Sequence, residues 1–74
     1  MKVLLFGMIA EKAGSRAIDC AAGSTEELRR ELERRIAGLS DISYALAIDR
    51  RIVKADVPLT GEEEIALLPP FAGG

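Results

Sequence analysis

Residues 24–36 of this chain read STEELRRELERRI, and this segment predicts a helix with one apolar face. Ser24, followed three residues later by Glu27, is the pattern of a capping box, in which two side chains satisfy free N–H groups at the start of a helix. The apolar positions recur every four residues, at Leu28, Leu32 and Ile36. Such a stripe needs an apolar surface to cover it, and one face of a sheet provides that surface in a chain of 74 residues.

Short apolar runs on either side of the helix predict the sheet. We expect strands at residues 2–6, 16–20, 45–48, 51–54 and 64–68, with one helical turn at residues 8–13. The order β-β-α-β-β-β predicts an α+β fold in which one main helix covers a mixed β-sheet. Period-2 alternation predicts the side chains that meet the helix: Val3, Leu5, Ile18, Leu46, Ile48, Ile65 and Leu67.

The opposite face of the predicted sheet carries a second apolar set. Its members are Leu4, Phe6, Ala47, Ala66 and Leu68. Contiguous exposed apolar patches mark partner sites, so we predict that this surface binds other proteins together with Pro69, Pro70 and Phe71. The alternative is that loops cover this face.

The sequence ends in PPFAGG, residues 69–74. Two prolines stop the last strand, because proline has no N–H for a sheet ladder and fixes its own φ. The two final glycines, Gly73 and Gly74, have no side chains and can enter a narrow passage. We therefore predict a β-sheet domain over residues 1–68 and a flexible tail over 69–74 that presents the Gly74 carboxylate to another protein.

Composition excludes several classes of function. The net charge of −2 and the pI near 5.0 argue against a nucleic-acid partner, which would require clustered Lys and Arg. The apolar run at residues 3–6 is too short for a signal peptide or a membrane span. The single cysteine cannot form an internal disulfide, so we expect a reducing compartment, the cytoplasm.

Residues for independent catalysis are missing from the sequence. There is no histidine and no glycine-rich phosphate loop, and Cys20 stands alone as an expected buried or half-buried strand residue. The acidic run at residues 62–64 reads as a solvated turn. We expect no cofactor or metal on this chain, and we predict a substrate or carrier for enzymes.

The chain resembles one known family over essentially its whole length. The resemblance is carried by residues 3–6 with Glu11 and Gly14, by 45–49, by 58–60, and by 65–70 with the terminal Gly-Gly. The chain is similar to the small, sulfur-carrying subunits of molybdopterin synthase, which are ubiquitin-like β-grasp proteins. The ending Pro-Pro-x-x-Gly-Gly is the specific part. This sequence departs from the family's usual residues in local turns, at Ala10, Asp49 and Gly61-Glu62.

The resemblance implies a mechanism centred on Gly74. A ubiquitin-activating-type adenylyltransferase would adenylate its carboxylate with ATP and Mg²⁺, and a sulfur donor protein would convert the adenylate to a thiocarboxylate. The large synthase subunit would then take up the tail, and the sulfur would attack a pterin precursor. The chain itself would be a non-catalytic carrier subunit.

Three alternatives share the expected fold. The first is the thiamine-pathway sulfur carrier, which usually lacks the double proline. The second is a ubiquitin-like modifier whose Gly74 forms an isopeptide bond with a lysine. The third is a plain β-grasp interaction module with an accidental Gly-Gly ending.

Overall fold

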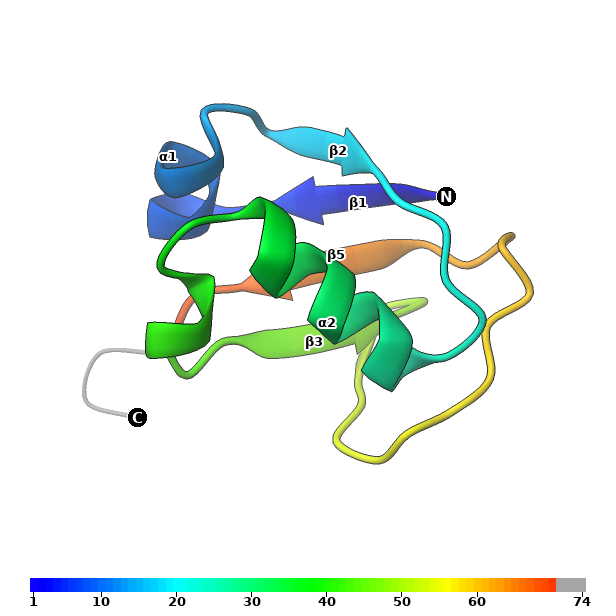
Figure 1. Cartoon of the computed structure of the whole chain (residues 1–74). Coiled ribbons are helices and arrows are strands. Elements are labelled where there is room, and N and C mark those ends of the chain that lie inside the picture. The colour runs from blue at the N-terminus through cyan, green and yellow to red at the C-terminus, as the bar shows by residue number, and fades with distance from the viewer. Residues whose placement is uncertain (71–74) are drawn as a thin grey trace.

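The structure is a computed structural model that describes residues 1–70 (Figure 1). Its elements are β1 Lys2–Leu5, α1 Gly7–Ala13, β2 Ala17–Asp19, α2 Thr25–Arg35, a 3₁₀ turn Leu39–Asp41, β3 Ala45–Ile48, β4 Arg51–Ile52 and β5 Ile65–Leu68. Figure 1 shows α2 lying across one face of the sheet, with α1 beyond the end of β1. The predicted α+β arrangement, with one main helix on a sheet, is confirmed.

The sheet is mixed, as predicted, and its strand order is β2-β1-β5-β3-β4. The central strands β1 and β5 run parallel, whereas β2, β3 and β4 each pair antiparallel with their neighbours. Because β1 and β5 run in the same direction, the chain leaves both strands at the same end of the sheet. Phe6, which follows β1, and Pro69, which follows β5, therefore both lie at this end.

The start of α2 is fixed by two side chains. Ser24 Oγ accepts the backbone N–H of Glu27 at 3.3 Å, which is one of the two hydrogen bonds of the predicted capping box. Asp56, which is distant in sequence, accepts the Glu26 N–H at 3.0 Å. That backbone donor stabilises the charged carboxylate and lowers the pKa of Asp56 below its ordinary value. The loop before β5 is thereby attached to the helix.

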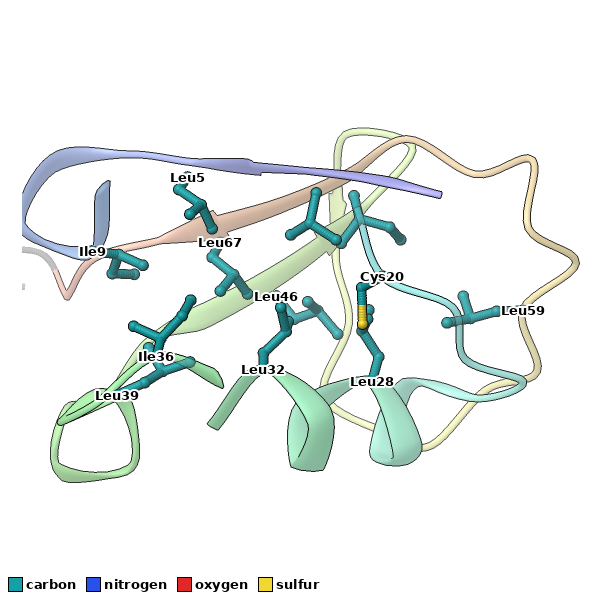
Figure 2. Packing of buried hydrophobic residues seen from close by; sticks show 12 residues of the cluster. Leu5, Ile9, Cys20, Leu28, Leu32, Ile36, Leu39, Leu46, Leu59 and Leu67 are labelled. Carbon is teal, nitrogen blue, oxygen red and sulfur yellow. The ribbon is translucent and has the colours of Figure 1, made fainter. Parts of the chain in front are cut away.

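The core lies between α2 and the sheet (Figure 2). Leu28, Leu32 and Ile36 are buried and extend toward strand residues such as Leu46 and Leu67, as Figure 2 shows. Five of the seven predicted helix-facing strand residues are buried: Val3, Leu5, Leu46, Ile65 and Leu67. The other two, Ile18 and Ile48, are partly buried and pack against the same cluster. The predicted side-chain alternation is therefore correct.

Several elements differ in their bounds from the sequence-based expectation. Strands β1, β2 and β5 are each shorter by one or two residues, and α1 and β4 also differ. The single turn expected at residues 8–13 is a seven-residue helix, α1, whose Ile9 is fully buried in the core. It ends at Gly14, whose φ of 72° suits a residue without a side chain. Strand β4 is shorter than expected and ends at Ile52, although the Val53 N–H still donates to the Leu46 carbonyl at 2.9 Å. Within residues 1–70 no helix combines the length and apolar character required to span a membrane.

A two-residue turn joins β3 to β4. Asp49 and Arg50 both have positive φ, 49° and 70°, as a type I′ hairpin turn requires. The Asp49 N–H donates to the Glu64 carbonyl at 2.8 Å, and Asp49 Oδ1 accepts the Glu64 N–H at 3.0 Å. The turn in which Asp49 departs from the family pattern is therefore hydrogen-bonded directly to Glu64, the residue that precedes β5.

Candidate functional site

The sheet face turned away from α2 carries a row of small and apolar residues. Leu4 pairs with Ala66, Ala66 with Ala47, and Ala47 with Ile52. Because paired residues share a face, the row crosses four strands, from β1 to β4. We call this surface, with Phe6 and Leu68, the open face.

Phe6 and Leu68 lie at the end of the open face where the chain leaves β1 and β5. Leu5 pairs with Leu67, so the next residues, Phe6 and Leu68, are neighbours at the ends of the two parallel strands. Phe6 is 46% exposed and Leu68 is half-buried. Pro69 follows directly. The most apolar part of the open face therefore adjoins the start of the predicted tail.

Exposure varies along the open face. Leu4, Ala66 and Leu68 are half-buried, but Ala47 is buried at 7% exposure. The expectation that Ala47 belongs to an exposed patch is therefore wrong, because this small side chain is flanked by Ala66 and by the larger Ile52. Ile52 itself is 53% exposed and was missing from the predicted set. The two-residue turn at 49–50 could have placed it opposite Ala47.

The other end of the open face is charged. A hollow there is lined by Leu4, by Lys2 of β1, and by the acidic run at residues 62–64. Lys2 also pairs with Asp19 across the β1–β2 ladder. The face thus changes from charged to apolar along the direction of β1 and β5, and a matching partner would present a polar group at one end and an apolar surface at the other.

Glu63 organises the acidic turn. Its carboxylate accepts the backbone N–H groups of Thr60 and Gly61, at 2.8 and 2.9 Å, and the Thr60 hydroxyl at 3.1 Å. These donors, with the Thr60 N–H as the largest cause, lower the pKa of Glu63 to about 2. The run is a surface turn, as expected, and Glu63 has a defined structural role within it.

Cys20 lies just after β2 and is buried at 5% exposure, where it joins the core cluster. The expected burial is confirmed, but the expected place in a strand is wrong, because β2 ends at Asp19. Its side chain is seen among the core residues in Figure 2, on the helix side of the sheet. It therefore does not line the open face.

Three of the predicted site residues, Phe71, Gly73 and Gly74, lie outside the described residues. Of the prolines that precede them, Pro70 is exposed, whereas Pro69 is half-buried and lies against Gly7. The tail boundary at residue 69 and the roles assigned to all of the site residues stay predictions. The structure brings the open-face residues together beside Pro69.

Comparison with known proteins gives a family match over residues 3–74, to the ThiS family. The chain is 34% identical, over an 80-residue alignment, to the molybdopterin synthase sulfur carrier subunit of Escherichia coli strain K12. That alignment covers 100% of this chain and 99% of the relative. The similarity therefore includes the C-terminal segment that the structure does not describe.

Two solved structures share the fold. SAMP1 from Haloferax volcanii superposes with a TM-score of 0.76 at 22% identity, covering 99% of this chain and 97% of that one. The complex of subunits 1 and 2 of molybdopterin-converting factor from Helicobacter pylori 26695 contains a chain that matches with a TM-score of 0.73 at 26% identity. The coverage there is 99% of this chain and 96% of the other. The ubiquitin-like β-grasp prediction is confirmed.

Proposed function

The chain belongs to the ThiS family, and we propose that it is the sulfur carrier subunit of a molybdopterin synthase. The observation that carries the proposal is the full-length similarity, at 34% identity, to the E. coli subunit of that name. The resemblance inferred from the sequence is thereby confirmed. The Helicobacter relative, which was solved as a complex of two subunits, supports a large-subunit partner for this chain.

The reacting group in this proposal is the carboxylate of Gly74. A carboxylate is a poor electrophile, so an adenylyltransferase of the ubiquitin-activating type first joins it to AMP, using ATP and Mg²⁺ and releasing pyrophosphate. A sulfur donor protein then delivers sulfur at the sulfide level, which attacks the acyl carbon; the bond to AMP breaks, AMP leaves and a thiocarboxylate remains. In the large subunit this sulfur attacks a carbon of a pterin precursor, and water then cleaves the acyl–sulfur bond, which leaves the sulfur on the pterin and returns the Gly74 carboxylate.

The chain contributes the carrier group and a docking surface, and its partners contribute the catalytic side chains. We propose that ATP and Mg²⁺ bind to the activating enzyme and that this chain binds no cofactor of its own. A single buried thiol suits a reducing compartment, and we place the reaction in the cytoplasm.

The open face is the proposed docking surface. It is the apolar side of the sheet that α2 leaves free. The end of this face that carries Phe6 and Leu68 adjoins the segment that leads to Gly74. A partner seated on this face would receive the tail at its own surface. A fully extended segment of six residues spans at most about 20 Å, which is enough to reach a recessed active site.

Binding measurements test the proposal and separate it from the thiamine-pathway alternative. The chain is titrated against the large synthase subunit and against a thiazole synthase from the same genome. We expect tight binding to the large subunit and none to the thiazole synthase. The reverse preference would assign the chain to the thiamine pathway, and binding to neither would contradict both carrier functions.

Leu68→Asp locates the docking surface. A charge at this half-buried position in a desolvated interface should weaken binding to the large subunit by about 2 kcal/mol or more, roughly thirtyfold. The matched control is Ala37→Asp, which adds the same charge at an exposed position just after α2. Circular dichroism verifies that both variants fold. A folded Leu68→Asp variant that binds as tightly as Ala37→Asp would place the interface elsewhere.

A further inference from the structure

Strand β2 forms one edge of the sheet (Figure 1), so some of its backbone N–H and C=O groups face away from β1. The Arg16 carbonyl, just before β2, accepts the Leu5 N–H of β1 at 2.8 Å. In an antiparallel pair, residues that bond to the neighbouring strand alternate with residues that do not. Ala17, the first residue of β2, and Asp19, the last, therefore direct their N–H and C=O groups out of the sheet.

Side chains of the same chain bond to these outward groups. Ser15 Oγ donates to the Ala17 carbonyl at 2.7 Å and accepts the Ala17 N–H at 3.3 Å. Arg35 Nη1, at the end of α2, donates to the Asp19 carbonyl at 2.6 Å. Of the outward N–H and C=O groups of Ala17 and Asp19, only the Asp19 N–H has no side-chain partner among the described residues.

These bonds occupy the positions that a further strand would use. An uncovered strand at a sheet edge is a template for the addition of another strand. The Ser15 hydroxyl offers Ala17 one donor and one acceptor, which are the groups that a residue of an added strand would offer. The Arg35 guanidinium is charged, so its bond to the Asp19 carbonyl is stronger than a bond between neutral groups. An incoming strand must therefore displace existing hydrogen bonds before it forms its own.

The opposite edge of the sheet is protected by its length. Strand β4 contains only Arg51 and Ile52. Because the Val53 N–H bonds to the Leu46 carbonyl of β3, the preceding residue, Ile52, directs its own N–H and C=O away from β3. Very short edge strands are one of the means by which proteins prevent the addition of a strand. The β2 edge, in contrast, needs its side-chain bonds.

We propose that Ser15 and Arg35 close the β2 edge against pairing with the β2 edge of a second copy of this chain. Two copies would meet there about a two-fold axis, with β2 antiparallel to β2, because the same surface would serve on both sides. The side-chain bonds to Ala17 and Asp19 compete with this pairing and keep the chain monomeric. The inference concerns self-association, and it does not rest on the proposed function.

The test variant is Ser15→Ala/Arg35→Ala, and its matched control is Ser40→Ala/Arg34→Ala. All of these side chains are exposed, so the control removes the same hydroxyl and the same charge from the surface. Ser40 lies in the 3₁₀ turn, and Arg34 bonds to Glu31 of its own helix rather than to a strand. A difference between the two variants therefore reports the bonds at the β2 edge.

Sedimentation equilibrium over a range of protein concentrations measures the self-association, and circular dichroism verifies that the variants fold. We expect the test variant to dimerise at concentrations at least about tenfold below those at which the wild type or the control does, because no side-chain bonds have to be displaced. A folded test variant that stays as monomeric as the control over the whole range would overturn the inference.

Hydrogen exchange locates the contact in the dimer. Pairing through β2 should slow the exchange of the Ala17 and Asp19 amides relative to the monomer and leave the Ile52 amide, at the opposite edge, unchanged. A dimer that protects Ile52, or that protects neither edge, would contradict the inference, since association would then use another surface.

The single variant Ser15→Ala keeps the inference testable if the double variant does not fold. It changes one exposed hydroxyl and removes both side-chain bonds at Ala17, so it should dimerise at lower concentrations than Ser40→Ala. Equal behaviour of these two single variants would overturn the inference.

Discussion

Glu63 shows how much one side chain organises at the residue scale. A run of three glutamates reads as uniform surface charge, yet only the middle carboxylate accepts both a backbone N–H of Thr60 and one of Gly61. The sequence could predict the turn from Gly61 and its neighbours. It could not predict which glutamate turns inward, because that depends on the path of the backbone around residues 60–63.

The pH dependence of stability tests this role. The folded-state pKa of Glu63, about 2, is below the ordinary value of 4.5, so the charged form stabilises the fold above pH 4.5. This contribution is lost as the pH falls from 4.5 toward 2. Glu63→Gln should therefore be less stable than the wild type at pH 7, and the difference should shrink over that window, as measured by urea unfolding at several pH values.

The neighbouring glutamate provides the control. Glu62 is exposed, and its carboxylate accepts no hydrogen bond from the described residues, so Glu62→Gln should unfold at the wild-type urea concentration. Equal effects of the two substitutions at pH 7 would mean that the loss of a charge, rather than the turn contacts of Glu63, explains the change.

At the scale of elements, periodicity predicts most of the structure. The capping pattern at Ser24 and the spacing of Leu28, Leu32 and Ile36 place α2 and its buried face correctly. Strand alternation likewise separates the core side from the open face. The predicted exposure of Ala47 was wrong because burial at this position depends on the pairing of Ala47 with Ile52. Alternation within a single strand carries no information about that pairing. The length of α1 was underestimated, since its burial rests on tertiary packing of Ile9.

Truncation of the helix stripe tests the interface between α2 and the sheet. Leu32 is fully buried, so Leu32→Ala should lower the free energy of unfolding by about 2–5 kcal/mol through lost burial and the cavity left behind. Arg30→Ala, on the solvent-exposed side of the same helix, should change the free energy of unfolding by less than about 0.5 kcal/mol. Urea unfolding measures both values. A loss below about 0.5 kcal/mol for Leu32→Ala would contradict the placement of α2.

At the scale of the whole molecule, the two faces of the sheet differ. Helix α2 and the core cover one face, and the face that α2 leaves open runs from a charged end at Lys2 to an apolar end at Phe6 and Leu68. Both strands end there, so the parallel pairing of β1 with β5 brings the proposed docking surface and Pro69 together. Sequence reasoning predicted the open-face residues except Ile52, but the order of strands that places this face beside Pro69 came from the structure.

In the proposed function Gly74 carries the sulfur, and mass spectrometry of the reconstituted reaction can locate it. The chain is incubated with ATP, Mg²⁺, an activating enzyme and a sulfur donor, and then fragmented. We expect one oxygen to be replaced by sulfur at the C-terminal residue, with Cys20 unmodified, and a chain extended by one residue after Gly74 to be inactive in pterin sulfuration. Sulfur found on Cys20, or full activity of an extended chain that stays uncleaved, would contradict the proposed role of Gly74.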